Sequence, residues 1–202
     1  MDDRFGFVIL NYRTMDETMD CVKSIDEHIR EAHEIVIVDN ASPDGSGEKL
    51  RQVYDGRDDI KVIINADNLG YACGNNAGIK QARLDGCRYV VVLNSDTKVM
   101  QDEFCDIVRQ EYRANGYAVI GPQIYKHGIP CCDNPGRDRA MSRFKLHIFI
   151  FMNRVFLALS YVALDAVLNR IFNAYVEAKK SDCQAVQNVE KVALHGCCLV
   201  FT

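Results

Sequence analysis

The feature of this sequence that most restricts its fold is a repeated change in hydrophobic period. Through the first two-thirds of the chain, short runs rich in Val, Ile and Phe alternate with segments whose apolar residues recur at helical spacing. Parallel strands need a crossover connection, which is usually a helix. The alternation therefore predicts an α/β fold, with a mostly parallel sheet and helices on both of its faces.

The predicted elements run in order from the N-terminus. Thr14 and Glu17 have the spacing of a capping box, so a helix is expected directly after the first strand. A turn-rich loop and a short helix follow the second strand, and glycines close the two later helices. The predicted strands are Phe5–Asn11, Ile35–Val38, Ile60–Asn65, Arg88–Asn94 and Tyr117–Gly121, and the two later helices cover 72–85 and 101–114.

Polar residues stand where four of these strands end. Asn11, Asp39, Asn65 and Asn94 each close an apolar run. In open α/β sheets, ligands bind beyond the carboxyl ends of the strands. We therefore expect a binding site at this edge of the sheet.

Two carboxylates at that edge are the candidates for chemistry. Asp96 follows a buried run among small polar residues. Mg²⁺ and Mn²⁺ prefer hard oxygen ligands and take few protein carboxylates when a diphosphate completes their shell. Asp39 ends the second strand, where its oxygens can accept hydrogen bonds from a nucleobase or a ribose. The alternative for Asp96 is an ordinary helix N-cap or turn role, and the alternative for Asp39 is an ordinary turn role.

The composition narrows the class of protein. The 202 residues carry a formal net charge of −4 and a pI of about 5.7, which disfavours nucleic acid as a partner. The nine cysteines include no Cys-x-x-Cys, and the N-terminus does not resemble a signal peptide, so a cytoplasmic protein with reduced thiols is expected. The sequence after the first strand lacks the glycines of a dinucleotide-binding loop, and no P-loop motif occurs.

The segment from 123 to 183 differs from the rest and is interpreted as a loop and helical insertion. Its apolar part, 144–175, is interrupted by charged residues. The longest uncharged stretch after Arg154 runs only from Val155 to Leu164, which is too short to span a membrane. The segment from 136 to 180 contains eight Lys or Arg residues and only three acidic residues. Such a basic, apolar helical segment either contacts the inner face of a membrane peripherally, packs on the sheet, or pairs two subunits as a homodimer.

Several motifs, in order, resemble the family 2 inverting glycosyltransferases of the GT-A fold, particularly bacterial rhamnosyltransferase-like and polysaccharide-assembly members. The ordered motifs cover Phe7 to about Pro122, and "HGCCLVFT" at the C-terminus is similar to a later strand of that family on the acceptor side. The motifs are Asn11-Tyr12, "VDNASPDGS" (38–46), "NLGYACGNNAG" (68–78) and "LNSDT" (93–97).

The resemblance implies a nucleotide-sugar site. Asp39 would contact the base of a UDP- or dTDP-sugar, and Asp96 would bind Mg²⁺ or Mn²⁺ in a D-x-D-like motif in which Asn94 replaces the first Asp. On this basis 1–122 is the nucleotide-sugar-binding half, and 184–202 begins the acceptor-side region. The residues implied to bind the nucleotide sugar are Asn11, Tyr12, Asp39, Asn40, Asn68, Gly70, Asn76, Asn94 and Ser95.

The implied reaction is transfer of the sugar to a hydroxyl of a glycan or lipid-linked acceptor, with inversion. The general base of the resembling family lies beyond the strand that ends this chain at Thr202, so no residue here inherits that role. We expect the chain to be a truncated piece of a longer enzyme. The alternative is a non-catalytic module that binds nucleotide sugars or serves assembly.

Overall fold

The structure is a computed structural model that describes residues 3–122, 124–126, 129–131, 147–148, 150–151, 154 and 198–202. The chain divides into two compact units. The first comprises Met1–Pro122 together with His195–Thr202, and the second comprises Gln123–Leu194. The predicted segment 144–175 lies almost entirely outside the described residues, so its role stays a prediction.

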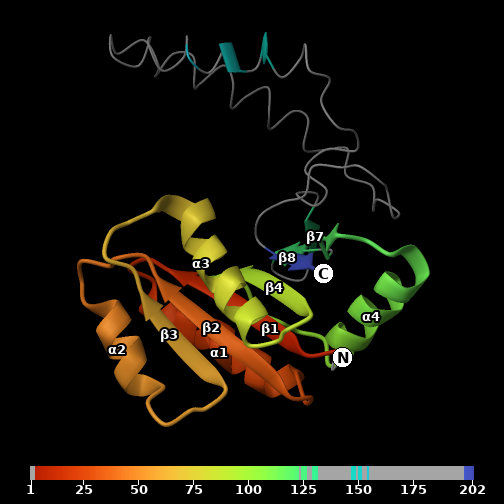
Figure 1. Cartoon of the computed structure of the whole chain (residues 1–202), viewed down its shortest axis with the longest axis horizontal. Helices are drawn as coiled ribbons and strands as arrows, with labels where there is room; N and C mark the ends of the chain where they lie inside the picture. Colours follow the sequence, from red (N-terminus) through yellow and green to blue (C-terminus); the bar gives the residue numbers. More distant parts are fainter. Residues whose placement is uncertain are drawn as a thin grey trace. The chain divides into compact units, whose positions relative to one another are not determined.

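The first unit is built on a six-stranded sheet in the order β3-β2-β1-β4-β8-β5 (Figure 1). Strands β1 to β4 are parallel, which confirms the predicted α/β fold. The strands of this sheet are β1 Phe5–Asn11, β2 His33–Asp39, β3 Ile60–Ile64, β4 Tyr89–Asn94, β5 Val119–Ile120 and β8 Cys198–Phe201. The helices are α1 Met15–His28, α2 Ser46–Val53, α3 Gly70–Leu84 and α4 Phe104–Asn115.

One edge of the sheet departs from the predicted succession of strands. The fifth predicted strand forms only over β5, and it pairs with β8 rather than with β4. Strand β8 lies antiparallel between them, with Val91 opposite Val200. No local pattern signals this insertion, because β8 comes from the far end of the chain and its position depends on a long-range pairing.

The two faces of the sheet have separate apolar cores. Alternate strand residues such as Phe7, Ile9 and Ile37 pack with α1, α2 and α4, whereas Val8 and Val38 pack with α3 on the opposite face. Figure 1 shows α3 in front of the strands and α1 behind them. The period of two along each strand thus supplies both cores.

Helix α3 approaches the sheet closely because glycines face it. A Cβ atom built on Gly78 would lie 2.3 Å from Val8 Cγ1, and one on Gly74 would lie 2.6 Å from Leu10 Cδ1. Neither position has room for a larger side chain. The start of α3 is thereby held against the carboxyl ends of β1 and β2, where the binding site is expected.

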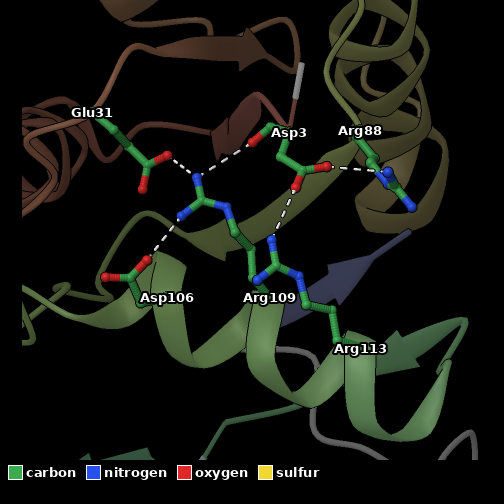
Figure 2. Close-up of polar contacts among 6 residues, drawn as sticks. All are labelled: Asp3, Glu31, Arg88, Asp106, Arg109 and Arg113. Carbon is green, nitrogen blue, oxygen red and sulfur yellow. Dashed lines mark hydrogen bonds and ion pairs between the residues drawn. The ribbon is translucent and has the colours of Figure 1, made fainter. Parts of the chain in front are cut away.

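Ion pairs fasten α4 to the opposite, amino edge of the sheet (Figure 2). Arg109 of α4 contacts the carboxylates of Glu31 and Asp106. Its guanidinium also lies over the ring of Phe5, 5.0 Å from the centroid. Asp3 bridges Arg88 at 3.1 Å and Arg113 at 3.8 Å. These contacts join the chain start, the loop before β2 and α4, so the amino edge is closed by protein partners.

The second unit contains an antiparallel pair, β6 (Ile124–Lys126) and β7 (Ile129–Cys131), in which Lys126 lies opposite Ile129. Within the described residues, no helix has both the length and the apolar character needed to cross a membrane.

Candidate active site

The polar strand ends meet at one edge of the sheet, as predicted. Asn11 lies opposite Asp39 in the parallel register, and Leu10 lies opposite Asn94. The backbone N–H of Asn65 donates to the carbonyl of Asp39 at 2.9 Å. Because β1 to β4 are parallel neighbours, their carboxyl ends line a single rim.

Asn11 is the centre of a buried hydrogen-bond network at this rim. Its side chain is 0% exposed, and its Nδ2 donates to Asp39 Oδ1 at 2.5 Å and to Ser46 Oγ at 3.0 Å. Its Oδ1 accepts from Thr18 Oγ1 at 3.1 Å and from the hydroxyl and backbone N–H of Thr14, both at 3.3 Å. The Nδ2 and Oδ1 atoms of the Asn11 side chain are therefore both hydrogen-bonded to protein partners.

Asp39 is also buried, at 1% exposed. Besides the Asn11 contact, its carboxylate accepts from the hydroxyl of Ser42 at 2.6 Å and from the backbone N–H of Ser42 at 2.9 Å. Gly47 lies directly against it, since a Cβ there would fall 2.7 Å from Asp39 Cγ. Asp39 thus fixes the loop that connects β2 to α2.

Asn40 organises the next loop in the same manner. It is 2% exposed, and its Nδ2 donates to Asn68 Oδ1 at 2.8 Å and to the carbonyl of Gly70 at 3.3 Å. Its Oδ1 accepts from Asn65 Nδ2 and from the backbone N–H of Leu69, both at 3.1 Å. These bonds connect the end of β2 to the first turn of α3.

The last residue of β4 and the residue after it are held from two sides. Ser95 Oγ accepts from Thr14 Oγ1 at 3.0 Å, and Asn94 Oδ1 accepts from Tyr71 OH at 2.9 Å. The predicted capping box is wrong, because Thr14 occupies the N-cap position of α1 without a capping bond from its side chain. Its hydroxyl instead joins the loops that leave β1 and β4.

Asp96, the next residue after Asn94 and Ser95, is exposed. Within the described residues, its carboxylate has no hydrogen-bond or ion-pair partner. It is not a helix cap, since the N-cap position of α4 is Glu103, seven residues later. Burial raises the pKa of Cys21 to about 12, and the charge of Asp96 adds to this effect, which places Asp96 on the α1 side of the rim.

The rim also contains strained backbone. Arg13 and Ala41 have positive φ angles of 61° and 60°, a conformation that residues other than glycine rarely adopt. Both follow the end of a strand, β1 and β2 respectively. The backbone N–H of Arg13 donates to Ser42 Oγ at 3.0 Å, so the network around Asp39 holds this conformation.

The predicted site residues thus separate into two groups. Asn11, Asp39 and Asn40 are buried and position the loops. Sequence reasoning missed their partners Thr18, Ser42 and Ser46, and also Tyr71, although the last three lie inside the quoted motifs. The residues at least partly open to solvent are Tyr12, Asn68, Gly70, Asn76, Asn94, Ser95 and Asp96.

The rim fits a hard divalent cation only in part. Asp96 offers one open carboxylate, while Asn94 Oδ1 and Ser95 Oγ already accept hydrogen bonds. This donor set suits Mg²⁺ or Mn²⁺ when phosphate oxygens supply further ligands. One carboxylate alone does not make a complete protein site for either ion.

A second group of metal-binding side chains lies at the amino edge. Ligand atoms of Asp26, His33 and Asp59 lie within 4.8 Å of one another, and no other such group occurs among the described residues. Arg57 already pairs with Asp26 at 3.0 Å and with Asp59 at 2.6 Å. Burial lowers the pKa of His33. The guanidinium therefore occupies the place where a cation would bind.

An open cleft of about 300 Å³ lies between α1 and α2, lined by residues such as Met19, Lys23 and Tyr54. None of its lining residues belongs to the carboxyl rim. It is accordingly separate from the network around Asp39 and from Asp96.

Comparison with known proteins is consistent with this architecture. The family described as Glycosyl transferase family 2 matches residues 7–167. The low-salt glycan biosynthesis hexosyltransferase Agl10 of Haloferax volcanii is 30% identical over 145 residues, which cover 71% of this chain and 44% of that protein. The chain therefore spans less than half the length of this curated relative.

Two solved structures share the fold at low sequence identity. The mannosyltransferase PcManGT from Pyrobaculum calidifontis, in complex with GDP-Man and Mn²⁺, is 16% identical with a TM-score of 0.53, covering 61% of this chain and 36% of that one. Staphylococcus aureus TarS 1-349 in complex with UDP-GlcNAc is 18% identical with a TM-score of 0.50, covering 64% and 37%. Because the family match extends over most of the chain and agrees with the ordered motifs, this protein belongs to glycosyltransferase family 2.

Proposed function

We propose that this protein transfers a sugar from a UDP- or dTDP-sugar to a hydroxyl of a glycan or lipid-linked acceptor, with inversion and with help from Mg²⁺ or Mn²⁺. The observation that carries the proposal is Asp96, an exposed carboxylate at the carboxyl rim of a family 2 chain. The neighbouring side chains of Asn94 and Ser95 are held by hydrogen bonds. The carboxylate of Asp96 itself has no partner among the described residues.

The open residues of the rim are suited to hold the nucleotide. Tyr12 is 42% exposed directly after β1 and offers an aromatic face on which a base can stack. Asn68 and Asn76 expose amide groups near the start of α3, where Gly70 lets a ligand approach the backbone. We assign these residues to the base and ribose.

The buried residues act by positioning the open ones. Asn11 and Asp39 hold Ser42, and with it the loop after β2, while Asn40 holds the start of α3. Direct contact between Asp39 and a base would require Ser42 to move, because Ser42 covers both carboxylate oxygens. We therefore propose a positioning role for Asp39 rather than the base contact that the sequence resemblance implies.

Asp96 would bind the cation, with Ser95 and Asn94 fixed beside it. A bound Mg²⁺ or Mn²⁺ supplies positive charge that stabilises the diphosphate as it leaves the sugar. The chain's own part is to hold the donor at the rim through the groups described above. The general base for the acceptor hydroxyl is not assigned to any described residue.

The proposal is tested by ligand-induced stabilisation. A ligand that binds only the native state raises the melting temperature. UDP or dTDP with Mn²⁺ should raise the melting temperature of the wild type, and Asp96→Ala should remove the Mn²⁺-dependent part. Asp58→Ala, at an exposed aspartate of the amino edge, is the matched control and should leave the response unchanged. Stabilisation that needs no metal, or an Asp96→Ala variant that responds like the wild type, would contradict the proposal.

A further inference from the structure

Arg13 stands out among the arginines of the first unit because its guanidinium has no polar partner within the described residues. Most arginines between residues 3 and 122 form an ion pair with a carboxylate or donate a hydrogen bond to a backbone carbonyl, and Arg30 is the other exception. Those with such a partner are Arg4, Arg51, Arg57, Arg83, Arg88, Arg109 and Arg113. Arg13 is also exposed and lies at the carboxyl rim.

Two other cationic side chains near the rim, among the residues that the structure describes, already have polar partners. Lys98 pairs with Asp20 at 2.8 Å, and Lys49 donates to the backbone carbonyl of Asp44 at 3.3 Å. Asp96 meanwhile brings negative charge to the same edge. An anionic ligand there needs compensating positive charge, and within the described part of the chain Arg13 offers a guanidinium at the rim without a polar partner.

One hydrogen bond links the two loops that carry Arg13 and Asp96. Thr14, the residue after Arg13, donates to Ser95, the residue before Asp96, at 3.0 Å. Arg13 and Asp96 therefore flank the same contact between the loops that leave two neighbouring strands. They nevertheless form no ion pair with each other, so both charges remain available to a ligand.

The backbone of Arg13 is also held in an unfavourable conformation. Its φ of 61° is unfavourable for a residue with a Cβ, and the bond from its N–H to Ser42 Oγ at 3.0 Å maintains it. Ser42 is in turn bonded to Asp39. The same network that fixes the loop after β2 therefore fixes the point from which the Arg13 side chain leaves.

We propose that Arg13 binds the diphosphate of the donor, beside the cation held by Asp96. The inference rests on the proposed function, because it takes the anion to be the diphosphate of a nucleotide sugar. A guanidinium presents two parallel N–H donors to phosphate oxygens, a geometry that lysine cannot reproduce. Arg13 thus acts as a binding residue for the phosphates and not for the base.

The experiment compares a nucleotide with its nucleoside. Dissociation constants for UDP and uridine are measured with Mn²⁺ for the wild type, Arg13→Ala, Arg13→Lys and Arg30→Ala. Hydrogen bonds to charged groups contribute roughly 1.5–3 kcal/mol, so Arg13→Ala should weaken UDP binding about 10- to 100-fold. Uridine binding should stay unchanged. Arg13→Lys should recover part of the loss, and Arg30→Ala, at the unpaired arginine near the amino edge, should behave as the wild type.

Each other outcome has a definite meaning. Unchanged UDP binding by Arg13→Ala would overturn the inference. An equal loss for UDP and uridine would overturn it as well, because the residue would then act through the shape of the loop. A wild type that binds none of UDP, dTDP or GDP with Mn²⁺ would refute the proposed function itself, and the inference with it. Where dTDP or GDP binds instead of UDP, the same comparison uses thymidine or guanosine.

Discussion

The buried amide of Asn11 is the most sensitive point of the rim, and Asn11→Asp tests it with almost no change of shape. In the wild type, Asn11 Nδ2 donates to Asp39 Oδ1 at 2.5 Å, and the two side chains are 0% and 1% exposed. The substitution replaces this donor by a second carboxylate oxygen. Two negative charges would then face each other without solvent.

The size of the effect follows from two limits. Two unit charges about 4 Å apart repel by about 4 kcal/mol at an effective dielectric constant of 20. The protein can avoid this repulsion by protonating one carboxyl, which at pH 7 costs about 4 kcal/mol for a group with an ordinary pKa near 3.9. We therefore expect Asn11→Asp to lose about 3–4 kcal/mol of unfolding free energy at pH 7.

The loss should depend on pH with a known sign. The folded state raises the pKa of the new carboxyl above its unfolded value, so the destabilisation is absent below about pH 4 and grows by about 1.4 kcal/mol per pH unit above it. The protonated carboxyl can also donate to Asp39, as the amide does. Urea unfolding of variant and wild type between pH 4.5 and 7.5 measures this difference.

Asn68→Asp is the matched control for Asn11→Asp. Asn68 is exposed, and its Oδ1 only accepts hydrogen bonds, from Asn40 Nδ2 at 2.8 Å and from the N–H of Gly70 at 2.9 Å. A carboxylate can accept both, so its stability relative to the wild type should change by less than about 1 kcal/mol and stay flat with pH. A difference below 1 kcal/mol for Asn11→Asp at pH 7, or one that does not vary with pH, would refute the described network.

Two further changes test the packing and the amino edge. Gly78→Val should lower the free energy of unfolding by at least about 2 kcal/mol, because even a Cβ would lie 2.3 Å from Val8 Cγ1. The control Lys80→Val, on the exposed side of α3, should lose only the difference in helix propensity. Equal melting temperatures for the two variants would contradict the close approach of α3 to the sheet. The pKa of Asp85 is lowered from 3.8 to about 2, chiefly by hydrogen bonding to Glu34 and next by hydrogen bonding to Lys61. The ionised Asp85 carboxylate therefore stabilises the fold above about pH 4, and this stabilisation is lost as the pH falls toward 2. Acid unfolding followed by circular dichroism should therefore be shallower over that window for Asp85→Asn, and an unchanged slope would show that Asp85 has no such role.

The secondary structure of the first unit was largely predictable because its signals are local. The runs that become β1 to β4 are apolar and β-branched, and each ends at a polar residue, as the structure confirms for Asn11, Asp39 and Asn94. Helix boundaries moved by a few residues, with α3 beginning at Gly70 instead of Ala72 and α4 at Phe104 instead of Gln101. Helix ends depend on the bonds made by a few terminal groups, and sequence spacing constrains those bonds weakly.

The capping box shows how a correct local pattern can lose to a tertiary contact. Thr14 and Glu17 have the right spacing, and α1 does begin beside Thr14. The threonine hydroxyl nevertheless bonds to Asn11 and Ser95, the latter 81 residues away. Such a partner becomes available only when β1 and β4 pair, which no short window of sequence can reveal.

The sequence by itself determined that this chain forms a mostly parallel α/β sheet and that its polar groups gather beyond the carboxyl ends of four strands, because the hydrophobic period and the strand ends depend on neighbouring residues. It did not show which of these polar residues are buried and which are open to a ligand, since Asn11, Asp39 and Asp96 all lie at or just after the end of a strand. The tertiary structure made that distinction: Ser42, Ser46 and Gly47 cover the first two, while Asp96 stays open. Burial of a side chain depends on distant loops that fold over it, so only the assembled rim decides which residues position the site and which are free to bind.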